Sequence, residues 1–412
     1  MRRLLAVAGV ALVVTSCGDE PSVEYDGPYA GEVRDAMVEI ERITGTPFKS
    51  PPRVATRQRA ELREIFQQEF EDKQGEALPF QETGYKLLGL IPPSLDLRAL
   101  LLDLLVEQVM GFYLPMDSTL YLVEEVPAAI RGGLLTHELV HALQGQYVNL
   151  DSIQRIERDE DRVIAAQALL EGQASLVMMR AMGQFVSVEQ QRTRIRQSQG
   201  EMPEFASAPL FVQEALIFPY LSGFEFVRQY LDQNASESLL ERDAFPTSSE
   251  QVLHWDQYAG ERDVPTRVTL PPPRTGTAVY DNNLGEFGTR LLLFVQSKEQ
   301  GTSISGAAGW DGDRYMIVRT PRGDGIVWVT IWDSTIEAGD FGSAMRRAID
   351  SRFYEPSSRR LPDGSTAFET ETRAIRVWGG TISGRAAVMY VDMPKGVETA
   401  GVDVQKVVLE ER

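Results

Sequence analysis

Residues 134–144 of this chain read LLTHELVHALQ, and this stretch decides how the rest is interpreted. Its apolar spacing, with Pro127 before it and Gly145 after it, predicts a helix from about 127 to 145. On that helix His137 and His141 stand four residues apart, so both rings project from one face. Two imidazoles on one face can bind one zinc ion, with Glu138 placed to act on a bound water. The chain has three histidines, so this pattern indicates a metal site more strongly than a surface helix with incidental histidines.

A second helix, expected over roughly 159–182, offers the third ligand of such a site. Its acidic start complements the helix dipole. One face carries, in order, Ile164, Ala168, Glu171, Ser175 and Met178. A carboxylate on an otherwise apolar or small face is costly to bury unless it is paired or binds a metal. A catalytic zinc site needs three protein ligands and one open position, and the candidates for the third are Glu171 and His254. We favour Glu171, because a ligand on a packed neighbouring helix is held rigidly.

The chemistry expected of this set is hydrolysis. Its cofactor is a single catalytic zinc ion, which lowers the pKa of its bound water towards neutrality. Glu138 would accept that water's proton during attack on a carbonyl and pass it to the leaving amine. The developing oxyanion needs a second hydrogen-bond donor. The candidates for this donor are His254, Tyr220 and Tyr258. We rank His254 first as the remaining histidine, although a structural role for it fits the sequence equally well.

The N-terminus has the features of an export signal. A basic start, Met1-Arg2-Arg3, precedes an apolar run over residues 4–14, which is too short for a bilayer span of roughly 20 residues. The residues at 14–17, VTSC, resemble a bacterial lipobox, which implies cleavage after residue 16 and lipidation of Cys17, the only cysteine in the chain. The alternative is an ordinary signal peptide with an incidental cysteine. We expect an exported protein, anchored by lipid to a bacterial membrane and facing the periplasm or the exterior.

The charge of the chain limits its partners. The formal net charge is −19 at pH 7, and no basic patch or nucleic-acid motif is evident. A chain of this charge repels nucleic acid and anionic lipid surfaces, so a nucleic-acid partner is not expected. Neutral or basic substrates are favoured instead.

The pattern of elements predicts an α+β protein with two domains. We expect a signal peptide at 1–16, a tether at 17–32, a mostly helical catalytic domain at 33–262 and a smaller α+β domain at 263–412. The boundary rests on the prolines at 265 and 271–273. In the helical domain we expect further helices at 33–43, 57–72, 97–110 and 209–232, a strand at 119–123, and a short helix capped by Ser248 or Ser249. Gly111–Pro115 is expected to end the third of these helices.

The C-terminal domain has the texture of strands joined by tight turns. We expect strands at 314–319 and 326–332, a helix at 336–353, and a hairpin of 373–378 with 386–390 that turns at Gly379-Gly380. Four of the tryptophans fall in this region and are expected to be core or half-buried strand residues: Trp310, Trp328, Trp332 and Trp378.

His137-Glu138-x-x-His141 together with Glu171-Gly172 resembles the gluzincin superfamily of zinc metallopeptidases. More closely, HELVHALQGQ at 137–146 with ALLEG at 168–172 is similar to predicted bacterial metallopeptidase-like proteins, and the similarity extends over roughly 95–260. The resemblance implies a zincin-like catalytic domain with a short sheet, whose strand at 119–123 would be the edge that pairs with an extended peptide or protein substrate.

One position departs from the pattern of that superfamily. Thermolysin-like members carry an aspartate four residues after the glutamate ligand, where it orients a ligand histidine. Here Ser175 takes that position, so either Ser175 makes a weaker contact of this kind or another acid does. The function implied is a lipid-anchored zinc peptidase. The alternatives are a non-catalytic binding or scaffold lipoprotein on the same fold, and a cell-wall amidase.

Overall fold

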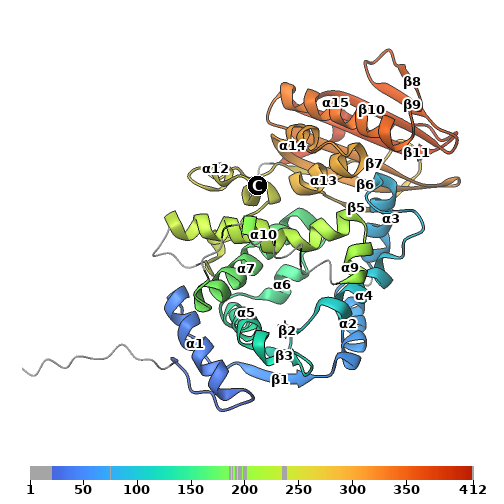
Figure 1. The fold of residues 1–412 in the computed structure, drawn as a ribbon. Helices are drawn as coiled ribbons and strands as arrows, with labels where there is room; N and C mark the ends of the chain where they lie inside the picture. Colours follow the sequence, from blue (N-terminus) through green and yellow to red (C-terminus); the bar gives the residue numbers. More distant parts are fainter. Residues whose placement is uncertain are drawn as a thin grey trace, which may run out of the picture.

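The computed structural model describes residues 21–74, 76–184, 202–233 and 239–410, with the single positions 187, 189, 190, 193 and 197. The expected signal peptide at 1–16 and the lipidation site Cys17 lie outside the described residues. The described chain combines helices and strands, as an α+β protein does: helices dominate its first part and a large sheet its second (Figure 1).

Helices enclose a small sheet in the first part of the chain. They are α1 (Ala30–Thr44), α2 (Arg59–Gln74), α3 (Leu78–Leu88), α4 (Leu97–Gln108), α5 (Ala128–Tyr147), α6 (Leu150–Gln154), α7 (Glu160–Ala181), α9 (Pro203–Ser207), α10 (Leu210–Gln233), the 3-10 turn η1 (Arg242–Ala244), α11 (Ser249–Leu253) and α12 (Trp255–Tyr258). The helices expected at 97–110, 127–145, 159–182 and 209–232 are confirmed. Ser248 caps α11 by accepting a hydrogen bond from Gln251 N, as one of the two capping alternatives predicted. Helix α3 was not predicted, because Ala77 gives it no side-chain cap and Gly84 interrupts its pattern.

The small sheet corrects two expectations. Its strands are β1 (Arg53–Arg57), β2 (Gly111–Leu114) and β3 (Thr119–Val123), in the order β1-β3-β2. Strand β3 was expected at the edge but is central: it pairs in parallel with β1 and antiparallel with β2. The segment expected only to end a helix is itself the edge strand β2. The parallel partner β1 comes from far earlier in the chain, and no local signal predicts such a pairing.

The described part of the expected tether is packed against the protein. Tyr25 is 6% exposed and belongs to an apolar cluster with Met37 and Leu139. The amide of Ser22 donates to Glu41 Oε2 at 2.9 Å. Helix α1 begins at Ala30, before the expected start of the domain. Residues 21–29 therefore belong to the folded domain, because burial of an aromatic ring outweighs the polar composition around it.

The second part is built on a seven-stranded antiparallel sheet with the order β5-β6-β7-β11-β10-β9-β8. Its elements are β5 (Thr277–Asn282), α13 (Gly285–Ser297), α14 (Gln300–Ala307), β6 (Trp310–Thr320), β7 (Gly323–Trp332), α15 (Thr335–Arg352), β8 (Ser357–Arg360), β9 (Thr366–Glu369), β10 (Arg373–Ile382) and β11 (Arg385–Pro394). A separate pair joins β4 (Arg267–Thr269) to β12 (Val408–Glu410), which follows the 3-10 turn η2 (Val404–Lys406). Helix α15 packs on β7, β10 and β11 (Figure 1).

The expected elements of this part are present, with one turn misplaced. Strands β6 and β7, helix α15 and the β10–β11 hairpin are confirmed, and Trp310, Trp328 and Trp332 are fully buried. The hairpin turns at Ser383-Gly384, with φ of 51° and 86°, rather than at Gly379-Gly380. Two consecutive residues with positive φ match the right-handed twist of the flanking strands, which selects this turn.

One hydrophobic core runs through both parts. Leu169 and Phe226 from the helices lie in the same cluster as Trp328 and Phe341 from the sheet and its helix. The region near residue 263 thus marks a change of secondary structure without interrupting the core. By length and composition, helix α10 is long and apolar enough to cross a membrane, but its buried residues, Phe226 among them, pack in this core.

Candidate metal centre

Helices α5, α7 and α10 form the scaffold of the candidate site. Helices α7 and α10 approach backbone to backbone at Gly172 and Gly223. A Cβ added to Gly172 would lie 2.2 Å from the carbonyl oxygen of Gly223, and one added to Gly223 would lie 2.0 Å from that of Ala168. Glycine is therefore required at both positions, and the close contact brings the preceding turn of α10 beside Glu171.

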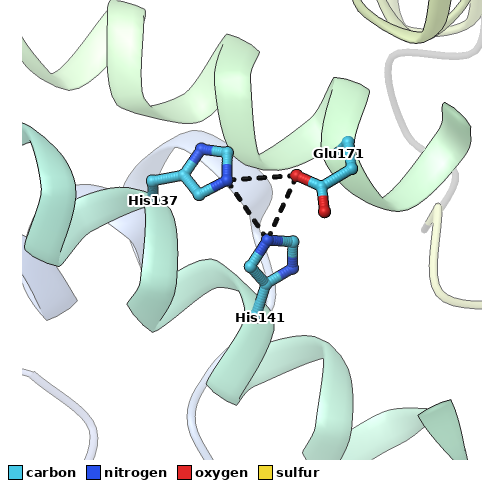
Figure 2. Close-up of side chains that lie close together, drawn as sticks. All are labelled: His137, His141 and Glu171. Atoms are coloured by element: carbon cyan, nitrogen blue, oxygen red, sulfur yellow. Dashed lines mark hydrogen bonds and ion pairs between the residues drawn. The ribbon is translucent and has the colours of Figure 1, made fainter. Parts of the chain in front are cut away.

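Three side chains converge between α5 and α7 (Figure 2). His137 Nε2 lies 3.1 Å from Glu171 Oε2, His141 Nε2 lies 3.4 Å from the same oxygen, and the two Nε2 atoms are 3.2 Å apart. In the described part of the chain, this is the only group of three histidine, cysteine, aspartate or glutamate side chains whose ligand atoms all lie within 4.8 Å of one another. Ligands of a tetrahedral zinc ion, at about 2.0–2.1 Å from the metal, lie roughly 3.3 Å from each other. The donor triangle therefore fits zinc.

The electrostatics of the cluster favour a bound cation. Burial raises the pKa of Glu171, but the adjacent His141 and His137 outweigh it and hold that pKa well below its usual range. Burial lowers the pKa of His141, and the carboxylate of Glu171 more than compensates, raising it to about 9. The carboxylate is therefore ionised and His141 holds a proton that a metal ion would displace.

Glu138 lies next to the triangle and is 6% exposed. Burial raises the pKa of its carboxyl group, and the neighbouring His141 and His137 partly oppose this. The edge strand β2 crosses directly over it: a Cβ added to Gly111 would lie 3.2 Å from Glu138 Cγ. A carboxylate with a raised pKa is a stronger base, which suits general-base catalysis near neutral pH.

Gln144 holds the imidazole of His141 in place. His141 Nδ1 lies 2.8 Å from Gln144 Oε1, while Gln144 Nε2 donates to the Leu170 carbonyl at 3.0 Å and to Gln173 Oε1 at 2.8 Å. Because the amide oxygen can only accept, Nδ1 carries a proton, and Nε2 presents its lone pair to the cluster once a metal ion displaces the second proton. Ser175, the other candidate for orienting a ligand histidine, is buried on α7. Gln144 follows His141 by three residues on one helix face, a spacing that could have been recognised in the sequence.

Tyr220 is the aromatic side chain at the site. Its ring centroid lies 6.2 Å from that of His137, with the planes 22° apart. The negative charge of Glu171 is the largest cause that raises the pKa of Tyr220 well above its usual value, followed by burial and Glu138. The hydroxyl therefore remains protonated and can donate, and the Tyr220 residue is 38% exposed.

The structure does not bring His254, the first-ranked donor candidate and the alternative third ligand, into the group of His137, His141 and Glu171. His254 Nε2 pairs with Glu286 Oε1 of α13 at 2.9 Å, and this hydrogen bond raises the pKa of His254. His254 follows helix α11, whose first residue, Ser249, donates a backbone hydrogen bond to Asp161 of α7. Asp161 precedes Glu171 by ten residues, which is roughly 15 Å along α7. The remaining candidate, Tyr258, is buried and donates to the Ala244 carbonyl.

Comparison with known proteins gives one match. Residues 273–395 match a family described as a domain of unknown function, DUF8575. This region covers the seven-stranded sheet and excludes the metal centre. No curated protein and no solved structure matches the chain.

Proposed function

We propose that this protein is a zinc-dependent peptidase of the gluzincin type, with a zincin-like helical domain, anchored by lipid at Cys17 in the bacterial cell envelope. The observation that carries the proposal is the triangle of nitrogen and oxygen donors beside a buried carboxylate. His137, His141 and Glu171 would hold the zinc ion. The location rests on the N-terminal sequence at 1–17.

Each residue of the site has a distinct role in peptide hydrolysis. The zinc ion, when bound, supplies an electrophilic centre that makes a water molecule acidic. Glu138 accepts the proton of the attacking water and returns it to the leaving nitrogen. Tyr220 donates its hydroxyl hydrogen to the carbonyl oxygen as negative charge develops there. Gln144 keeps His141 in the tautomer that binds metal.

The substrate backbone has a place beside these groups. Strand β2 is an edge of the small sheet and crosses Glu138 at Gly111. An edge strand offers unpaired backbone groups to an extended peptide. We therefore assign substrate pairing to β2 instead of the central strand β3.

The decisive experiment compares Glu138→Gln with the wild type. We expect detergent-solubilised Glu138→Gln to retain about one zinc per chain and to cleave a peptide library at least 100-fold more slowly, as loss of a general base predicts. Glu398→Gln is a matched control, because Glu398 is exposed in the second part of the chain. Zinc-loaded protein without any turnover that depends on Glu138 would instead support a binding or scaffold lipoprotein. Turnover only of cell-wall amides would support an amidase.

A further inference from the structure

A groove of about 640 Å³ lies along helices α7 and α10. Its walls come from α3, α4 and the approach to α7, and one wall comes from strand β5 of the large sheet. Apolar side chains, among them Phe80, Leu101, Ile164, Leu216 and Val279, share the lining with polar and charged ones such as Arg155, Arg158 and Glu160. All five apolar side chains are only partly buried, so they present apolar surface to the groove.

The groove leads toward the metal centre. On α7, Ile164 and Gln167 line it, and Glu171 follows on the same face at the next turn. On α10, Val212 and Leu216 line it, and Tyr220 follows in the same way. The inner end of the groove is thus one helical turn, roughly 6 Å, from the metal centre.

The two helices run in the same direction, so the two stripes of side chains stay together. At their N-terminal ends, Tyr85 bridges them: its hydroxyl is hydrogen-bonded to Glu160 and its ring packs 4.8 Å from that of Phe211. Further along, Gly172 meets Gly223. The groove therefore follows the seam from Glu160 to Gln167 on α7 and from Phe211 to Leu216 on α10.

The large sheet takes part in this groove through a β-bulge. The register between β5 and β6 shifts between Ala278 and Tyr280, which makes Val279 the extra residue. Bulges redirect side chains out of the regular alternation, and Val279 lines the groove. Val279 lies in the region that matches the domain of unknown function. This region thereby contributes directly to the groove, at the end where Asn282 is hydrogen-bonded to Glu160.

We propose that this groove binds an extended peptide segment with bulky apolar side chains and guides it to the metal centre, an inference that rests on the proposed function. From Glu160 to Glu171 the seam measures about 16 Å, which is the length of about five extended residues. The apolar part of the walls suits large apolar side chains, while Gln167 in the lining offers hydrogen bonds to a peptide backbone. The net charge of −19 favours a peptide with basic flanks.

Binding can be measured without catalysis. The probe is a fluorescein-labelled decapeptide of alanine, serine and lysine with a central leucine–phenylalanine pair, and its counterpart carries two serines there. Anisotropy titrations use full-length, zinc-loaded Glu138→Gln, which cannot consume the peptide. We expect the apolar probe to bind at least tenfold more tightly than the polar one. Equal affinities for the two probes would refute the proposal.

Two substitutions fill the groove from opposite sides. Ala215→Trp acts from α10, where Ala215 lines the groove, and Val279→Trp acts from the sheet. Each should abolish the preference for the apolar probe with zinc content unchanged. Gln233→Trp is the matched control, because Gln233 is exposed at the end of α10, and it should keep the preference. Thermal melting checks folding, and if Ala215→Trp is unfolded then Val279→Trp carries the test.

The outcomes separate the groove from the peptidase activity. If the apolar preference is present and lost in both tryptophan variants, the groove is supported even when wild type cleaves neither probe. If wild type cleaves the probes and the tryptophan variants leave both binding and cleavage unchanged, the groove proposal fails while the peptidase proposal stands.

Discussion

Replacement of Gln144 by methionine tests whether the metal centre depends on the layer of residues behind its ligands. Methionine has a similar length and no polar group. The substitution removes the contact to His141 Nδ1 at 2.8 Å and the two bonds that the amide donates, at 3.0 and 2.8 Å. Gln144 is 0% exposed, so water cannot replace these bonds.

The magnitude follows from the partners left behind. Leu170 lies within α7, so its carbonyl oxygen keeps the bond of its own helix. Gln173 Oε1 and the ring of His141 lose a buried partner, at about 1–3 kcal/mol each. We therefore expect the free energy of unfolding to fall by about 2–6 kcal/mol. Zinc affinity should fall 10- to 100-fold, the usual effect of losing a residue that orients a metal ligand.

The assay is competition for zinc with a chromophoric chelator, beside thermal melting. Gln296→Met is the matched control, because Gln296 is a buried glutamine on α13 whose amide donates to the Leu88 carbonyl. It should lose stability with zinc affinity unchanged. If Gln144→Met binds zinc as tightly as the wild type, the assignment of Gln144 as the residue that positions His141 is refuted.

Three further predictions concern the same site. Gly223→Ala places a Cβ 2.0 Å from the Ala168 carbonyl oxygen and should move α7 and α10 apart. We expect it to lower the free energy of unfolding by about 1–3 kcal/mol and to weaken zinc binding, and an unchanged melting temperature would contradict this. Tyr220→Phe should keep zinc and slow peptide cleavage by about 10²–10³, and wild-type turnover in this variant would rule out the hydroxyl as a donor to the oxyanion. Zinc affinity should rise about tenfold per pH unit between pH 6 and 8, because zinc displaces one proton from His141, whose pKa is raised to about 9. A zinc affinity that does not change with pH in this range would show that no proton is displaced.

Several elements of the site could be predicted because their signals are local. His137, Glu138 and His141 share a helix, and the helical period alone places the two rings on one face. Glu171 stands out as a carboxylate on an apolar stripe. Gln144 lies one helical turn beyond His141, so its contact with that ring could also have been predicted, although Ser175 was expected to orient a ligand histidine. The position of His254 could not be predicted, because its partner Glu286 lies on α13 and sequence gives no distance between separate elements.

The amino-acid sequence by itself determined the long helices α4, α5, α7, α10 and α15, the strands of the main hairpins and the residues that could bind a metal, because these follow from periodicities over a few residues. Only the tertiary structure decided that β3 is central and β2 the edge, and that Tyr220 lies at the site. The physical reason is that both depend on contacts between distant segments: the parallel pairing of β1 with β3, and the backbone approach of α7 to α10 that Gly172 and Gly223 allow.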